Sequence, residues 1–175
     1  AGQPAHFHNP IEAQCAGISI IYQEFNLVPA LSARENIFLG RERLRFGLLR
    51  REEEGQQARK LFDRLGVQID PDVPCRDLSV AQQQLVEIAK ALSLEARILV
   101  MDEPSATLTP PEVQRLFGII RELRAQGLGV IYISHRLEEI LTIADRVLVL
   151  RDGQRVGARP AGELTRGELI EMMVG

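Results

Sequence analysis

The sequence of 175 residues contains no tryptophan, two cysteines and few other aromatic side chains. Cys15 and Cys75 stand alone, without the paired spacing of a zinc site or a disulfide framework. Metal-binding and disulfide roles are therefore not expected for them. Two reduced thiols, as in proteins of a reducing compartment, are the default interpretation.

Long apolar runs and a strong net charge are also missing. No apolar stretch approaches the roughly 20 residues that a membrane-spanning helix needs, and no basic and then apolar signal peptide opens the chain. A net charge of −3 gives no general electrostatic attraction to nucleic acid or to anionic membranes. With 45% apolar and 26% charged residues, the chain has the composition of an ordinary globular protein. Its length suffices for one domain with a core, or for most of a larger one.

The most informative segment is an apolar run, residues 98–101, that ends on two adjacent carboxylates, Asp102 and Glu103. Such a run is typical of a buried parallel strand, and ligands of α/β sheets gather at the carboxyl ends of these strands. Neighbouring strand residues point to opposite sides, so one acid can hold Mg²⁺ while the other activates a water molecule. The pair suits phosphoryl transfer to water, although an isolated Asp-Glu pair is more often only an acidic strand end.

The first half of the chain is predicted to be mostly helical. Asn9 and Pro10 begin a short helix that ends near Ala16, and residues 18–22 form a buried strand that leads to Gln23. The pattern beyond it predicts a helix capped by Ser32 and Glu35, an irregular basic connection over residues 44–51, an amphipathic helix over residues 52–65 and a helix that begins at Ser79.

The second half alternates between strands and helices. Strands are predicted over residues 98–101, 129–134, 146–150 and 154–157, and helices over residues 110–126, 137–144 and from residue 166 onward. Asp152 and Gly153 suit a tight hairpin turn. This alternation predicts an α/β fold with a mostly parallel sheet, flanking helices and an inserted α-helical subdomain.

Four polar features follow one another along the chain: Gln23, the helix start at residues 79–82, the Asp102–Glu103 pair and His135. Each has a purely structural interpretation, because Gln23 and His135 are also ordinary strand termini and residues 79–82 match a capping box. A helix start is in addition an anion site, since its unpaired N–H groups favour phosphate oxygens. His135 follows a predicted strand and is expected at the same sheet edge as the acid pair.

Taken together, these features resemble the ATP-binding cassette (ABC) ATPases, and within them the ATP-binding subunits of bacterial ribose, galactose and xylose importers. The resemblance extends from about Gly2 to the end of the chain. It rests on a Q-loop region at residues 22–29 with its continuation to 42, a signature motif and its helix at 77–93, a Walker B strand at 97–103, a D-loop at 105–109, an H-switch at 134–139 and the following hairpin at 147–157.

The resemblance implies a role for each polar residue. Asp102 and Gln23 would hold Mg²⁺, partly through water. Glu103 would polarise the attacking water, with His135 and Gln23 as the other catalytic residues. The nucleotide-binding residues would be Ser79, Ala81 and Gln82, which would meet the γ-phosphate of ATP on a facing cassette.

The resemblance also implies an organisation and partners. The chain would have a partial P-loop NTPase fold with a RecA-like sheet: residues 1–23 as the first part of the ATPase core, residues 24–95 as a helical subdomain with the signature motif, and residues 96–175 as the remaining core. Its partners would be a second ATP-binding cassette, transmembrane permease subunits and, indirectly, a periplasmic sugar-binding protein, with no nucleic acid. It would lie in the cytoplasm, on the inner face of the plasma membrane, and hydrolyse ATP to drive the import of a monosaccharide.

One departure from the family pattern is the absence of a G-x-x-x-x-G-K-[S/T] phosphate loop, which Lys60 and Lys90 on predicted helices cannot replace. The sequence also opens without methionine, so we interpret it as an N-terminally truncated cassette that is inactive in isolation. A smaller departure is Ala81, where the signature has glycine. If that position needs a positive φ, alanine adds strain of about 1 kcal/mol.

Two other hypotheses remain beside the ATPase. The chain can be a non-catalytic module that docks on a membrane subunit or on an intact cassette and offers Ser79 to it. An ABC ATPase of DNA repair or chromosome maintenance is disfavoured, because the stretch from Gln23 to Ser79 is short and carries no CxxC motif.

Overall fold

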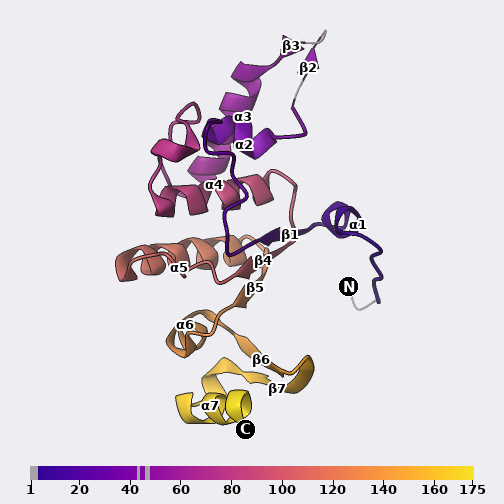
Figure 1. The fold of residues 1–175 in the computed structure, drawn as a ribbon, viewed down its shortest axis with the longest axis vertical. Helices are drawn as coiled ribbons and strands as arrows, with labels where there is room; N and C mark the ends of the chain where they lie inside the picture. Colours follow the sequence, from indigo (N-terminus) through magenta and orange to yellow (C-terminus); the bar gives the residue numbers. More distant parts are fainter. Residues whose placement is uncertain (1–3, 43, 46–47) are drawn as a thin grey trace. The chain divides into compact units, whose positions relative to one another are not determined.

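The computed structural model describes residues 4–42, 44–45 and 48–175, and the chain divides into two compact units, one up to Ile131 and one from Tyr132 to Gly175 (Figure 1). The elements that begin in the first unit are α1 (Pro10–Cys15), β1 (Ile18–Ile21), α2 (Ala33–Phe38), β2 (Leu44–Arg45), β3 (Leu48–Leu49), α3 (Arg51–Arg64), the short 3₁₀ helix η1 (Cys75–Asp77), α4 (Val80–Leu92), β4 (Ile98–Asp102), α5 (Pro110–Ala125) and β5 (Gly129–Ile133). The second unit contains α6 (Leu137–Ile143), β6 (Arg146–Arg151), β7 (Gln154–Pro160), the 3₁₀ helix η2 (Ala161–Glu163) and α7 (Arg166–Val174).

The main sheet has the strand order β1-β4-β5. β1 and β4 are parallel, with a register that runs from Ile18 opposite Ile98 to Ile21 opposite Met101. Parallel neighbours require a crossover connection, and here that connection contains α2, α3 and α4. The predicted α/β class with a parallel sheet and an inserted helical segment is confirmed.

Only one face of this sheet is buried within the described residues. Leu99 and Met101 are fully buried, whereas Ile20, Ile98 and Ile131 on the other face are 48%, 37% and 52% exposed. The predicted burial of these strands is therefore confirmed for one face and wrong for the other, although parallel strands are usually buried on both faces. These three isoleucines therefore do not belong to the core.

The predicted helix starts are confirmed where the sequence carries a capping box. Capping boxes begin the helices α2, α4, α5 and α7, at Ser32, Ser79, Thr109 and Thr165. At Thr109, for example, the Glu112 carboxylate accepts from both the backbone N–H and the hydroxyl, at 2.8 and 2.7 Å. These caps satisfy backbone groups that have no partner inside the helix.

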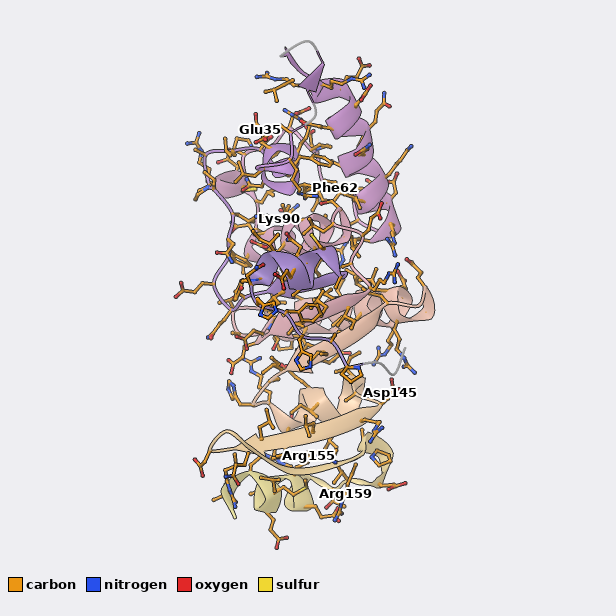
Figure 2. All side chains as sticks on the ribbon, turned by 90° about the vertical axis from the view of Figure 1, so that its right-hand side faces the viewer. Glu35, Phe62, Lys90, Asp145, Arg155 and Arg159 are labelled. Carbon is orange, nitrogen blue, oxygen red and sulfur yellow. The ribbon has the colours of Figure 1, made fainter. Side chains whose placement is uncertain are left out.

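The helices α2, α3 and α4 pack against one another, and α4 also packs on β1. On the apolar face of the predicted helix over residues 52–65, Ala58, Phe62 and Leu65 are fully buried and Leu61 is half-buried (Phe62 is labelled in Figure 2). A side chain such as Phe62 contributes about 1.5–3 kcal/mol when it is removed from water. Burial of this face therefore fixes α3 against its neighbours.

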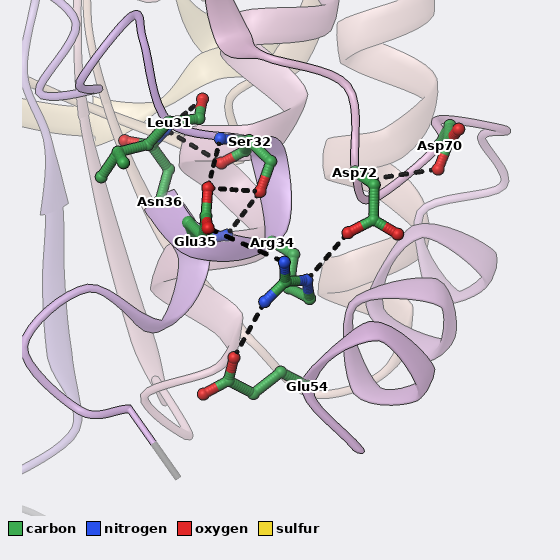
Figure 3. A network of polar contacts seen from close by, with 8 residues as sticks. All are labelled: Leu31, Ser32, Arg34, Glu35, Asn36, Glu54, Asp70 and Asp72. Atoms are coloured by element: carbon green, nitrogen blue, oxygen red, sulfur yellow. Dashed lines mark hydrogen bonds and ion pairs between the residues drawn. The ribbon is translucent and has the colours of Figure 1, made fainter. Parts of the chain in front are cut away.

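A buried ion-pair network joins α2 to α3 and to the loop before η1 (Figure 3). Arg34 Nη1 lies 3.2 Å from Glu54 Oε2, and Arg34 Nε lies 3.0 Å from Asp72 Oδ1. The side chains of Arg34 and Glu54 are 7% and 3% exposed, whereas that of Asp72 is 61% exposed. Arg34 Nη2 also lies 3.8 Å from Glu35 Oε1, so the guanidinium has one buried partner and two more exposed ones.

The irregular connection predicted over residues 44–51 is wrong. β2 and β3 form a short antiparallel hairpin there, and α3 begins directly afterwards at Arg51. Two-residue strands are too short to show the alternation that identifies a strand in a sequence. β7 also extends to Pro160, beyond the predicted strand at residues 154–157.

The second unit is built on the antiparallel pair β6 and β7. Asp152 and Gly153 in the connecting turn have φ values of 52° and 74°, as a hairpin turn of the Asp-Gly type requires. A small core of Val147, Val149, Ala161, Leu164 and Leu169 packs with apolar residues of α6 and with Met172. None of the helices in the described parts of the chain has the length and apolar character needed to span a membrane.

Candidate nucleotide site

Three of the expected site residues lie at one edge of the main sheet. Asp102 is the last residue of β4, Glu103 follows it, and Gln23 comes two residues after the end of β1. The parallel pairing of Ile21 with Met101 places these carboxyl ends side by side. Asp102 and Glu103 are half-buried and Gln23 is exposed, so the edge presents two carboxylates and one amide.

The backbone of Glu103 has a φ of 45°, in the left-handed region. Such a conformation costs a non-glycine residue about 1–3 kcal/mol and is concentrated at functional sites. Strand alternation therefore applies only as far as Asp102 and does not determine where the Glu103 side chain points. The chain then turns tightly, with the N–H of Ala106 donating to the Glu103 carbonyl at 3.1 Å and Ser105 almost fully buried.

Ser79 and Gln82 form the capping box at the start of α4. The Ser79 N–H donates to Gln82 Oε1 at 2.9 Å, and the Gln82 N–H donates to Ser79 Oγ at 3.2 Å. The N–H groups of Val80 and Ala81, in the first turn, have no partner within the helix. Ala81 has no positive φ, so the conditional strain of an alanine at this position does not arise.

A cavity of about 300 Å³ lies between the start of α4 and the start of α5. Ser79, Ala81 and Gln82 line it on one side, and the D-loop residue Leu108 and Glu112 line it on the other. The structure therefore brings the predicted nucleotide-binding residues next to the segment that follows the acid pair. Gln84 also lines this cavity, and its buried Nε2 atom has no hydrogen-bond partner.

His135 belongs to the second unit, in the exposed turn between β5 and α6. Buried Glu139 organises this turn: its carboxylate accepts from the Tyr132 hydroxyl at 2.8 Å and from Arg136 Nη1 at 3.2 Å. The Arg136 N–H in turn donates to Ser134 Oγ at 3.0 Å. These contacts hold the backbone on both sides of His135.

The donor set at the sheet edge suits Mg²⁺ better than a metal that needs many protein ligands. Among the described residues there is no group of three or more His, Cys, Asp or Glu side chains that could hold an ion. Mg²⁺ usually keeps several waters and binds one or two carboxylates together with substrate phosphates. The carboxylate of Asp102 and the amide oxygen of Gln23 fit that pattern.

The sequence prediction missed two further buried acids, Glu87 of α4 and Glu139 of α6, which are 6% and 8% exposed. Glu87 stands in an otherwise apolar stretch between Val86 and Ile88. A lone acid in such a stretch is a signal of a buried polar contact, because charged residues are almost never fully buried unless paired.

Comparison with known proteins agrees with this geometry. The sequence model of the ABC transporter family matches residues 2–106. The ribose import ATP-binding protein RbsA of Hahella chejuensis is 57% identical over 99% of the chain, and RbsA 1 of Burkholderia thailandensis is 54% identical over the same share. Each match covers 35% of the relative, so the chain spans about a third of the length of these curated relatives.

Solved structures show the same architecture. The ATP-binding cassette MJ1267 of an ABC transporter superposes with a TM-score of 0.79 at 27% identity, over 96% of this chain and 72% of that one. A nucleotide-free cassette from an ABC transporter superposes with a TM-score of 0.75 over 95% of this chain and 72% of that chain, at 24% identity. At that identity the second likeness supports the fold alone.

Proposed function

Since the chain belongs to the ABC transporter family, we propose that it is an ATP-hydrolysing part of the ATP-binding subunit of a sugar importer, with ribose as the first substrate to test. The observation that carries the chemistry is the parallel pairing of β1 with β4, which gathers Gln23, Asp102 and Glu103 at one edge. The sugar class rests on the 57% identity to a ribose import ATP-binding protein.

The acid pair divides the chemistry of hydrolysis between its two members. Asp102, at the end of β4, and the amide of Gln23 would hold Mg²⁺, in part through water. The bound ion neutralises charge on the phosphate oxygens. Glu103 orients and polarises the water that attacks the γ-phosphate, because a carboxylate within hydrogen-bond reach of that water accepts its proton. His135 contacts the γ-phosphate and responds to its loss.

The start of α4 meets the γ-phosphate of ATP bound on a facing cassette. The first-turn N–H groups, those of Val80 and Ala81, face such an anion, and the hydroxyl of Ser79 is a further donor. Gln82 takes part through the cap, since its side chain fixes the backbone of Ser79. The methyl group of Ala81 narrows the approach of the phosphate, so we expect weaker contact than with glycine.

The proposed assembly has the partners of an importer: a second ATP-binding cassette, transmembrane permease subunits and, through them, a periplasmic sugar-binding protein. The subunit would lie on the cytoplasmic face of the membrane. Within the chain, residues 1–23 and 96–175 form the ATPase core, and residues 24–95 form the helical subdomain that docks on the permease. This division follows the helical stretch between β1 and β4.

The test is the Mg²⁺-dependent ATPase rate of the full-length protein with and without Glu103→Gln. Loss of the catalytic base should lower kcat by about 100-fold or more. Glu122→Gln, which changes an exposed acid on α5, is the matched control and should leave the rate unchanged. Equal rates for the wild type and Glu103→Gln would refute the role of Glu103 as catalytic base.

A non-catalytic partner module is the second candidate, because Ser79 lines a cavity at the start of α4 where another protein could present its nucleotide. Such a module would dock on a membrane subunit or an intact cassette and lend it Ser79. It predicts that Ser79→Ala lowers the ATPase rate of the assembled transporter while Glu103→Gln does not.

A further inference from the structure

We propose that Glu87 and Lys90 of α4 are positioning residues that tie the segment after Gln23 to the signature helix, so that Gln23 and Ser79 move as one body. This inference rests on the proposed function, because it assigns these residues a part in ATP hydrolysis. It gives a role to two residues of the signature helix for which the motif pattern implies none.

The contact consists of two hydrogen bonds to one residue. The backbone N–H of Asn26 donates to Glu87 Oε1 at 2.7 Å, and Lys90 Nζ donates to the backbone carbonyl of Asn26 at 3.0 Å (Lys90 is labelled in Figure 2). Glu87 and Lys90 are three residues apart on α4 and so lie on one face of it. Both backbone groups of Asn26 are therefore bound by one helix.

A second anchor lies two residues further along the same segment. The Val28 N–H donates to Asn36 Oδ1 at 2.7 Å, and Asn36 Nδ2 donates to the Val28 carbonyl at 3.0 Å. Asn36 is fully buried on α2, which packs against α4. A pair of neighbouring helices thus holds alternate residues of this segment in the way that a partner strand would.

The burial of Glu87 favours the conformation in which its carboxylate binds Asn26. Glu87 is 6% exposed, and burial raises the pKa of its carboxyl, while the ammonium of Lys90 and the N–H of Asn26 act in the opposite direction. A buried carboxylate without these partners would be costly. The state of lowest free energy is therefore the one in which Asn26 is hydrogen-bonded to Glu87 and Lys90 of α4.

The consequence for the site follows from the rigidity of α4. Ser79 caps the start of this helix, and Glu87 lies about 12 Å along it at the usual rise per residue. Gln23 precedes Asn26 by three residues and stands at the carboxyl edge beside Asp102. A displacement of Gln23 on loss of the γ-phosphate therefore passes through Asn26 to α4 and to Ser79.

The experiment is a double-mutant cycle on the ATPase of the full-length protein. Glu87→Leu should lower kcat about tenfold, the rate equivalent of one charge-assisted hydrogen bond, with KM for ATP changed by less than about twofold. Glu87→Gln should restore most of the rate, because its amide oxygen still accepts from the Asn26 N–H. Val86→Ala changes a fully buried neighbour whose apolar side chain cannot form a hydrogen bond to Asn26. It controls for loss of stability and should keep kcat near the wild-type value.

The second arm places Glu87→Leu in a Gln23→Ala background. A residue that acts through Gln23 has nothing left to position there, so Glu87→Leu should cause no further fall in kcat. Additive losses, or a Val86→Ala variant as slow as Glu87→Leu, would overturn the inference. If the ATPase rate of the wild type does not depend on Glu103, both the proposed function and this inference are overturned. If the rate depends on Glu103 but Glu87→Leu leaves it unchanged, the inference alone is overturned.

Discussion

Replacing Glu54 by leucine should destabilise the first unit far more than replacing Asp72 by alanine, although both carboxylates bind the same guanidinium. Arg34 lies 3.2 Å from Glu54 and 3.0 Å from Asp72, so distance alone predicts equal effects. The difference is burial: the side chain of Glu54 is 3% exposed and that of Asp72 is 61% exposed (Figure 3).

The magnitudes follow from the state that each substitution leaves behind. Glu54→Leu leaves Arg34 buried without its buried partner, which costs about 3–5 kcal/mol. Asp72→Ala removes a solvated ion pair, which contributes at most about 1 kcal/mol. The double variant Arg34→Met/Glu54→Leu removes both buried charges together with their desolvation penalty, so it should be more stable than Glu54→Leu alone.

Urea unfolding measures these free energies by linear extrapolation. Far-UV circular dichroism is the suitable probe, because the chain has no tryptophan and two tyrosines for fluorescence. The reasoning is refuted if Asp72→Ala costs as much as Glu54→Leu. It is refuted equally if the cost of the double variant equals the sum of the costs of Arg34→Met and Glu54→Leu, since burial then plays no part.

The remaining predictions concern a thiol and a helix cap. Burial raises the pKa of the Cys75 thiol, whereas Cys15 is exposed. A thiol reagent at about pH 8 should therefore modify Cys15 at once and Cys75 only after unfolding. Equal rates of modification of the two thiols in the folded protein would contradict this. Hydrogen bonds from the backbone N–H and the hydroxyl of Ser32 lower the pKa of the Glu35 carboxyl. Their stabilisation is therefore present at neutral pH and is lost as the pH falls through this lowered folded-state pKa. Ser32→Ala should therefore lower the free energy of unfolding by about 1 kcal/mol at neutral pH and by less at low pH, and a cost that does not vary with pH would count against the reasoning.

The features that the sequence predicts correctly have local signals. A capping box is complete within four residues, so the starts of α2, α4 and α5 need no distant contact to be specified. The apolar run before Asp102 likewise identifies β4 by itself. Because the parallel partner of β4 ends next to Gln23, the sheet edge with Gln23 and the acid pair follows from the predicted strands alone.

The features that the sequence does not predict depend on residues far apart. Glu87 meets Asn26 across 61 positions of the chain, and Arg34 meets Glu54 across 20. The left-handed backbone of Glu103 has no compositional signal, since glycine is the residue that usually marks such a conformation. The roles of Ser79, Ala81, Gln82 and His135 stay predictions.

The two anchors on residues 26 and 28 act on the main chain, and this sets which sequence changes the segment tolerates. Any residue other than proline supplies the N–H and C=O groups that Glu87, Lys90 and Asn36 bind, so the side chains of Asn26 and Val28 are open to substitution. Insertion or deletion of one residue before Val28 would move the main-chain groups away from the side chains that bind them. The reason is that a strand-like backbone presents its polar groups to one side only at alternate residues. Among related chains, this stretch should therefore vary in composition while its length stays constant.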